Sequence, residues 1–277
     1  MALSYPFDPA VVPSGVLSSY FGLIAIFHTF KTARSGAWDM VPFCVGAWLE
    51  SAGHMARFVS ALESLTHDPS LVTYLLQAIL TLSAPALFAS SLYQRLVGAV
   101  VPDRKTGTSH ERTRQRRCLL MLWICGEAVS SLLQACAVYF MTADSEVPVG
   151  IGRELGARAI VVQVVLLAVA VTGAGVCFAR TFRARSQRPA DITIPDRRQL
   201  LLITSCLVTL LLRSTLRLVA HDDDAFGKRE SLRYVVEACL MVVVDPAGFF
   251  VYPNDAGVGV VKDGEEAHSM VNYGPVC

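Results

Sequence analysis

The chain has 277 residues, of which 53% are hydrophobic and only 17% are charged, and its mean hydropathy is +0.47. A soluble globular domain carries about 25% charged residues, so this composition excludes an ordinary soluble protein and indicates a membrane protein. The formal net charge of +1 by itself says nothing about nucleic acid, and no nucleic-acid partner is expected of such a membrane protein.

Seven mostly apolar stretches follow one another, and each is close to the ~20 residues with which a helix crosses ~30 Å of hydrocarbon. They are residues 11–30, 38–60, 71–98, 118–141, 158–179, 199–219 and 232–252. The third and fifth contain long uncharged runs, whereas the second and seventh hold several ionisable residues. The sequence therefore predicts an all-α bundle of seven membrane-spanning helices over residues 1–253, followed by a flexible polar tail at 254–277.

The basic residues of the loops predict the orientation of this bundle. Lys31 and Arg34 follow the first stretch, and two larger groups follow the third and the fifth. These groups are Arg104, Lys105, Arg112, Arg114, Arg116 and Arg117, and Arg180, Arg183, Arg185, Arg188, Arg197 and Arg198. The alternate loops are acidic or mix both signs, so we expect the amino terminus outside and the carboxyl tail in the cytosol. No Lys or Arg precedes Lys31, so the first stretch is expected to be a true span rather than a cleaved signal peptide.

The cysteines and short motifs give no sign of a redox, metal or nucleotide site. Seven cysteines lie within the spans and Cys277 ends the tail, so we expect no outer disulfide and mainly packing roles, with acylation of Cys118 or Cys177 as the alternative. No CxxC, HExxH or Walker-type loop occurs. The "HDDD" at 221–224 is interpreted as a solvated outer loop rather than a ligand set. No cofactor and no metal are expected.

Ionisable side chains inside the predicted spans are the most informative feature, because each costs a few kcal/mol in hydrocarbon unless it faces a partner or water. In the second span, Glu50, His54 and Arg57 share one helical face. Other spans contribute Glu127, Ser130 and Gln134, then Arg213 and Arg217, and finally Glu237 and Asp245. At ~1.5 Å rise per residue, Arg213 and Glu237 lie level below the outer edge, with Glu50 and Glu127 near mid-membrane.

Two interpretations of these residues are open. Pairs such as Arg213–Glu237 and Glu50–His54 can simply tie helices together. Alternatively, the acids and bases of helices two, four, six and seven line one polar cavity that opens to the exterior. The presence of ionisable residues on four spans at related depths favours the cavity. In the third span, Gln77 and Pro85 suggest a kinked or broken helix whose freed carbonyl faces it.

Spaced motifs along nearly the whole chain resemble those of the fungal RTA-like, or lipid-translocating exporter, family of seven-span proteins. They are "YPFDPA" with His28, "ESAGHMAR" (50–57), "QAILTLSAPALFASSLY" (77–93), "EAVSSLLQ" (127–134), Gln163, "RSTLR" (213–217) and "ESLRYVVEACLM" (230–241). The chain departs from the family pattern where "ACA" follows Gln134, at Ala220, at Tyr252–Pro253, and where Glu127 and Glu237 replace Asp. These departures bear on substrate identity more than on fold.

The resemblance implies movement or efflux of amphipathic lipids, such as sphingoid bases, or resistance to toxic sterol-like or porphyrin-like compounds. The candidate cavity residues are Glu50, His54, Arg57, Gln77, Tyr93, Glu127, Gln134, Gln163, Arg213, Arg217, Tyr234 and Glu237. The acids would attract an amine or exchange protons, and the arginines would hold those acids ionised or bind an anionic group. Without an ATPase motif, net transport would need a gradient, for example of protons.

Two other functional classes remain open at this point. A membrane-embedded cyclase or isomerase could use the same carboxylates as general acid and base on a hydrophobic substrate. A seven-helix lipid sensor is disfavoured by the absence of an outer cysteine pair and by "YQRLVGAV" after the third span, which lacks an Asp-Arg-Tyr-like motif. We expect a multi-pass protein of the plasma membrane, with an endomembrane as the alternative, whose partners are membrane lipids and an amphipathic small molecule.

Overall fold

The computed structural model describes residues 11–65, 70–100, 109–142, 149–187, 197–222, 238–248 and 250–251, and its regular structure in these ranges is entirely helical. The helices are α1 (Val11–Ser35), the 3-10 turn η1 (Trp38–Met40), α2 (Val41–Glu63), α3 (Leu71–Val100), α4 (Ser109–Thr142), α5 (Val149–Gln187), α6 (Arg197–Asp222) and α9 (Leu240–Gly248). The prediction of an all-α helical bundle is confirmed. The first part of the seventh predicted span, 232–237, and the tail at 254–277 lie outside the described residues.

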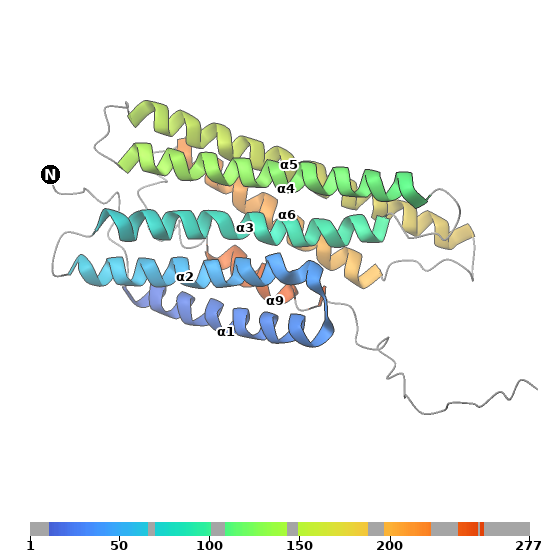
Figure 1. The fold of residues 1–277 in the computed structure, drawn as a ribbon, viewed down its shortest axis with the longest axis horizontal. Helices are drawn as coiled ribbons and strands as arrows, with labels where there is room; N and C mark the ends of the chain where they lie inside the picture. The colour runs from blue at the N-terminus through green and yellow to red at the C-terminus, as the bar shows by residue number, and fades with distance from the viewer. Residues whose placement is uncertain are drawn as a thin grey trace, which may run out of the picture.

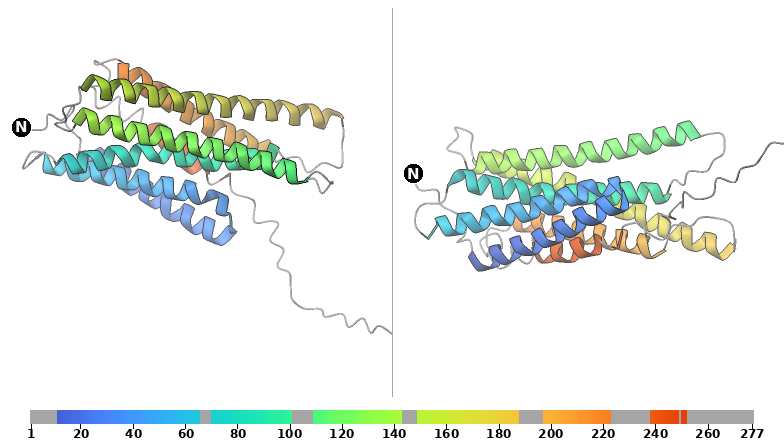
Figure 2. Two further views of the ribbon diagram at one scale, coloured as in Figure 1. Left: turned by 45° about the horizontal axis from the view of Figure 1, so that its top comes forward. Right: turned by 60° about the horizontal axis from the view of Figure 1, so that its bottom comes forward.

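The helices form one elongated bundle in which α1 to α6 alternate in direction (Figure 1). Each helix packs against the next one along the chain, α9 packs against α6 and α1, and α3 also contacts α6. Figure 2 shows α1 and α2 on one side of the bundle and α4 and α5 on the other. The contact between α3 and α6 therefore runs through the middle of the bundle.

Within the described ranges, five helices are long and apolar enough to cross a membrane: Val11–Ser35, Leu71–Val97, Arg117–Met141, Gly150–Ala179 and Arg198–Ala220. Helix α2 is also long enough to cross a membrane, since its 23 residues at ~1.5 Å per residue span roughly 35 Å. Its hydropathy is lowered by Glu50, Arg57 and Glu63. The sequence anticipates this contrast, because the second predicted span is one of the two that carry several ionisable residues.

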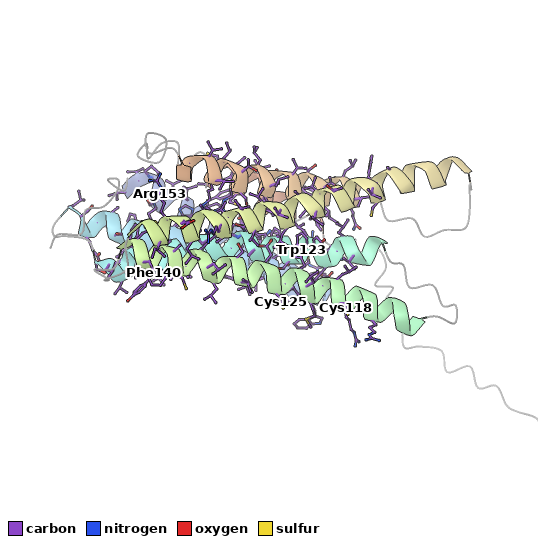
Figure 3. All side chains as sticks on the ribbon, turned by 90° about the horizontal axis from the view of Figure 1, so that it is seen from above. Cys118, Trp123, Cys125, Phe140 and Arg153 are labelled. Atoms are coloured by element: carbon purple, nitrogen blue, oxygen red, sulfur yellow. The ribbon has the colours of Figure 1, made fainter. Side chains whose placement is uncertain are left out.

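The buried core is mainly apolar, with Phe21, Phe43 and Phe88 among its largest side chains, but several buried positions are polar, as α4 illustrates. Its buried positions repeat every three or four residues and are Trp123, Glu127, Ser130, Gln134 and Ala137. Its outer face carries large apolar side chains, including Leu119, Leu122 and Leu132, each more than half exposed. Figure 3 labels Trp123 among the helices and Cys118 and Cys125 on the outer side of α4, where both cysteines are exposed. This distribution suits a helix that faces lipid on one side and other helices on the opposite side.

One end of the bundle collects the basic residues that predict its orientation. The end of α1, with Lys31 and Arg34, lies at the same end as the start of α4 and the start of α6 (Figure 1). At this end Arg95 of α3 holds Asp39 of η1 through two contacts, Nε–Oδ2 at 2.7 Å and Nη2–Oδ1 at 3.0 Å. This paired contact fixes the α1–α2 connection to α3. That the basic end faces the cytosol stays a prediction.

Candidate functional site

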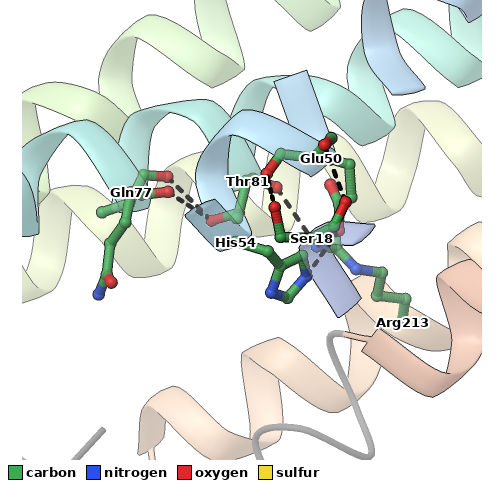
Figure 4. A network of polar contacts seen from close by, with 8 residues as sticks. Ser18, Glu50, His54, Gln77, Thr81 and Arg213 are labelled. Atoms are coloured by element: carbon green, nitrogen blue, oxygen red, sulfur yellow. Dashed lines mark hydrogen bonds and ion pairs between the residues drawn. The ribbon is translucent and has the colours of Figure 1, made fainter. Parts of the chain in front are cut away.

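A set of buried ionisable side chains from three helices occupies the α1–α2–α9 side of the bundle. Glu50 Oε1 lies 3.9 Å from Arg213 Nη2 and 3.8 Å from His54 Nε2. Each of these side chains is at most 3% exposed. Figure 4 shows the Glu50 carboxylate between the imidazole of His54 and the guanidinium of Arg213. Together with Asp245 of α9, described below, these residues are the charged set.

A proline in α3 supplies a backbone partner for Arg213. Pro85 has no N–H, so the carbonyl of Thr81, four residues earlier, receives no hydrogen bond from within the helix. Arg213 Nη2 donates to that oxygen at 3.3 Å. The sequence expectation that a freed carbonyl in the third span would face the polar interior therefore has a specific partner in the structure, namely Arg213 (Figure 4).

Glycines allow α2 and α3 to approach closely beside the charged set. A Cβ added at Gly53 would lie 2.6 Å from Thr81 Cγ2 and 3.2 Å from Thr81 N. A Cβ at Gly46, two turns earlier, would lie 3.1 Å from the carbonyl oxygen of Ala84. Small residues at helical spacing are the usual means of close helix packing in membranes. Gly53, within "ESAGHMAR", thus sets the distance between Glu50 on α2 and the Thr81 carbonyl.

Asp245 completes the charged set and was not among the cavity residues that the sequence nominated. Its side chain is 0% exposed and interacts electrostatically with Glu50 and Arg213. Within the described part of the chain, neither carboxylate oxygen of Asp245 has a hydrogen-bond partner. The sequence signal was present, since "VVVDPAGFF" places one acid in an otherwise apolar run. Arg213 thus pairs with Glu50 at 3.9 Å, and the charges of both residues act on Asp245.

Two side chains of α1 donate hydrogen bonds to backbone carbonyls of α9 at and near Asp245. Pro246 deprives the carbonyl of Val242 of its helical donor, and Tyr20 Oη donates to that oxygen at 3.2 Å. His28 Nε2 donates to the carbonyl oxygen of Asp245 at 2.9 Å, within the last turn of α9, where carbonyls lack helical partners. The resemblance pointed to His28 without giving it a role, and no sequence signal singled out Tyr20.

A second polar set joins α4 to α5. Ser130 Oγ donates to the carbonyl of Ala159 at 2.8 Å, and Gln134 Nε2 donates to Ser130 Oγ at 3.2 Å and to Gln163 Oε1 at 3.1 Å. The side chain of Gln163 also interacts with Glu127. These contacts run between α4 and α5, whereas those of the charged set run between α2, α3, α6 and α9. The residues expected to line one cavity therefore fall into two sets, with Glu127 in the α4–α5 set.

The other nominated residues have different positions. Tyr93 of α3 stacks on Trp123 of α4, with ring centroids 3.6 Å apart and planes at 11°. Gln77 is buried, but its side chain extends away from Glu50 and Arg213 in Figure 4. Arg57 is buried on α2, and Arg217 is half-buried one turn after Arg213 on α6. Tyr234 and Glu237 lie outside the described residues, so the expected pairing of Arg213 with Glu237 stays a prediction.

Membrane-length helices with apolar outer faces and a few buried charged side chains define a multi-pass membrane protein with an intramembrane polar site. The family model described as RTA1 like protein matches residues 43–256. The chain belongs to the RTA1-like protein family, which confirms the resemblance of its motifs. It is similar to "Protein RTM1" of Saccharomyces cerevisiae, with 26% identity over 258 residues that cover 86% of this chain and 74% of the relative. No solved structure matches it.

The matched region includes every residue of the charged set but not the α1 residues that bind the backbone carbonyls of α9. Glu50, Arg213 and Asp245 lie within residues 43–256, whereas Tyr20 and His28 precede them. Within the described residues no group of three or more His, Cys, Asp or Glu side chains has metal-binding geometry. The charged set offers two carboxylates, an imidazole and a guanidinium.

Proposed function

We propose that the protein translocates amphipathic lipids or lipid-like toxic compounds across its membrane and that the charged set binds their polar headgroup. The observation that carries this proposal is the Asp245 carboxylate. It is fully buried, it lies beside Glu50 and Arg213, and no described residue donates a hydrogen bond to it. A buried carboxylate without donors is costly, so a ligand that brings donors gains binding energy there.

The α4–α5 set supports this assignment by contrast. There, hydroxyl and amide groups form a chain that ends on the backbone carbonyl of Ala159, as polar residues that join helices in membranes do. Glu127 of this set also has two carboxylate oxygens without a hydrogen-bond partner among the described residues, but it interacts with the neutral amide of Gln163 rather than with a second acid and a guanidinium. The contacts of Glu50 with His54 and Arg213, at 3.8 and 3.9 Å, are instead longer than good hydrogen bonds. The charged set is therefore the better candidate for ligand binding.

The charge of the set favours a cationic headgroup. With both carboxylates ionised and His54 neutral, Glu50, Asp245 and Arg213 together carry one negative charge. A protonated amine, such as that of a sphingoid base, would neutralise this charge and donate hydrogen bonds to Asp245. An anionic headgroup would have Arg213 as its partner but would meet two acids beside it.

Aromatic rings next to the charged set would accept the apolar part of the ligand. The imidazole of His54 stacks on Phe21, with centroids 5.2 Å apart and planes at 14°. Phe43 lies 4.8 Å from His28 and 4.5 Å from Phe88, centroid to centroid. An amphipath bound with its amine at Asp245 would thus place its first methylene groups against these rings. We further propose that the protein resides in the plasma membrane.

A vesicle assay tests the proposal. The purified full chain is reconstituted in lipid vesicles, and transfer of a labelled long-chain base between the leaflets is followed in the wild type and in Glu50→Gln and Asp245→Asn. We expect at least a tenfold loss of flux in both variants. Glu154→Gln is the matched control, because it makes the same change at a 64% exposed side chain and should keep the wild-type flux.

Three results would contradict the proposal. Equal flux in wild type and Glu50→Gln would remove the headgroup role of the charged set. Flux no faster than in protein-free vesicles would show that the protein does not translocate this class of substrate. A chemically altered lipid among the extracted products would favour the membrane-embedded isomerase or cyclase, in which the same acids act as general acid and base.

A further inference from the structure

We infer that Glu50 and Asp245 hold one exchangeable proton between them and that a monovalent organic cation displaces it, so that each cation bound releases one proton. This inference rests on the proposed headgroup site and adds the ion to which binding is coupled. It also names the two carboxylates that carry the exchange, one on α2 and one on α9.

The charged set holds two acids and one arginine. Both carboxylates interact with the guanidinium of Arg213, which is 3% exposed, and both acids are 0% exposed. A net charge left in a low-dielectric interior costs several kcal/mol. Two carboxylates that share a site and one compensating cation do not both stay ionised. In the absence of ligand, one proton on the Glu50–Asp245 pair makes the charged set neutral.

Among the described residues, the groups that face the pair besides Arg213 are a tyrosine, a cysteine, two histidines and a carbonyl oxygen. From α1, Tyr20 interacts with Asp245 and His28 donates its Nε2 hydrogen to the Asp245 carbonyl. From α6, Arg213 and Cys206 interact with Asp245, and α3 contributes the Thr81 carbonyl oxygen, an acceptor of the Arg213 guanidinium. From α2, His54 lies 3.8 Å from Glu50, and a proton on its imidazole in place of a carboxyl group leaves the charge count and the exchange unchanged. Arg57 follows Glu50 by two turns, roughly 10 Å along the helix axis.

A cation can replace the proton without changing the charge of the set. An alkylammonium ion enters with one positive charge, and one proton leaves the carboxyl pair for water. No covalent bond other than the O–H bond of the carboxylic acid is broken. The ammonium N–H groups then donate to the Asp245 oxygens, for which the described residues provide no donors. One proton for one cation makes the exchange electroneutral, so a proton gradient can drive export of the cation without a contribution from the membrane voltage.

Calorimetry on the full chain in lipid nanodiscs tests the exchange. The probe is dodecylammonium at neutral pH, far below the pKa of an alkylamine, so that the probe stays protonated and any released proton comes from the protein. Its binding heat is measured at one pH in buffers of different ionisation enthalpy, with protein-free nanodiscs as the blank. The slope of heat against ionisation enthalpy gives the number of protons released, and we expect about one per bound cation. The matched variant Glu154→Gln should give the same slope.

The outcomes separate the inference from the proposed function. Binding of the probe with no proton released would overturn the exchange while leaving the headgroup site intact. Absence of binding would overturn both. In Asp245→Asn we expect weaker binding and a slope near zero, and a slope that stays near one would remove Asp245 from the exchanging pair. Should Asp245→Asn fail to fold, Glu50→Gln removes the same charge from the partner helix and is expected to give the same loss of slope.

Discussion

Replacing Gly53 with Ala adds one methyl group where α2 and α3 lie closest to the charged set. The new Cβ would lie 2.6 Å from Thr81 Cγ2 and 3.2 Å from Thr81 N. Carbon atoms in good contact lie about 3.5–4.0 Å apart, so the methyl is about 1 Å too close to Thr81. Because the backbone nitrogen is also near, rotation of the Thr81 side chain alone does not remove the clash. The two helices must separate.

The cost follows from two opposing terms. Overpacking of this kind costs about 1–3 kcal/mol, whereas Ala in place of Gly gains up to ~1 kcal/mol of helix propensity. We therefore expect Gly53→Ala to destabilise the protein by about 1–2 kcal/mol and to lower its Tm by several degrees. The separation also lengthens the hydrogen bond from Arg213 to the Thr81 carbonyl, now 3.3 Å, beyond its useful range. Gly53→Ala should therefore lower both the stability of the protein and its affinity for a cationic amphipath.

Thermal unfolding of the purified protein in detergent measures the effect, and two further variants sharpen it. Gly173→Ala in α5 is the matched control, because an added Cβ there meets nothing within 4 Å. It should leave Tm unchanged or raise it slightly. Thr81→Ser removes Cγ2 and should reduce the cost of Gly53→Ala by at least ~0.5 kcal/mol in a double-mutant cycle. Equal Tm values for Gly53→Ala and Gly173→Ala would refute the close contact between α2 and α3.

Three other substitutions test the remaining contacts. Pro85→Ala returns a helical donor to the Thr81 carbonyl, so the protein should become more stable while lipid flux falls; a loss of stability with unchanged flux would contradict this. His28→Ala removes the hydrogen bond to the Asp245 carbonyl, so urea or thermal unfolding should show a free energy of unfolding that is lower by about 1–3 kcal/mol. A Tm within error of the wild type would refute this expectation. Gln134→Leu breaks the α4–α5 set and should lower Tm without altering proton release on cation binding; a changed slope would place that set in the exchange.

The helices and the polar face of α2 could be predicted from the sequence because both follow from local periodicity. Glu50, His54 and Arg57 recur at helical spacing, and all three are at most 4% exposed in the structure. Their buried face is therefore confirmed. The rise per residue placed Arg213 roughly 6 Å nearer the outer edge than Glu50. The long arginine side chain covers that difference, which is why two residues at unequal depths meet.

The partners of each polar face could not be predicted, because spacing along one helix does not say which helix lies opposite. Glu127 shares its face with Ser130 and Gln134 as expected, yet that face meets Gln163 of α5 rather than Glu50. The role of Asp245 depends on tertiary packing in the same way. Its burial and its neighbours on α2 and α6 become visible only once α9 is placed in the bundle.

Both ends of the charged set are built around a carbonyl that a proline has freed. Pro85 frees the Thr81 carbonyl for Arg213, and Pro246 frees the Val242 carbonyl for Tyr20. Inside hydrocarbon, backbone carbonyls without helical donors are tolerated only where protein or water satisfies them. Each break therefore demands a side chain from another helix at a fixed place. Because prolines also concentrate bending in a helix, the proposed headgroup would bind where α3 and α9 bend most easily.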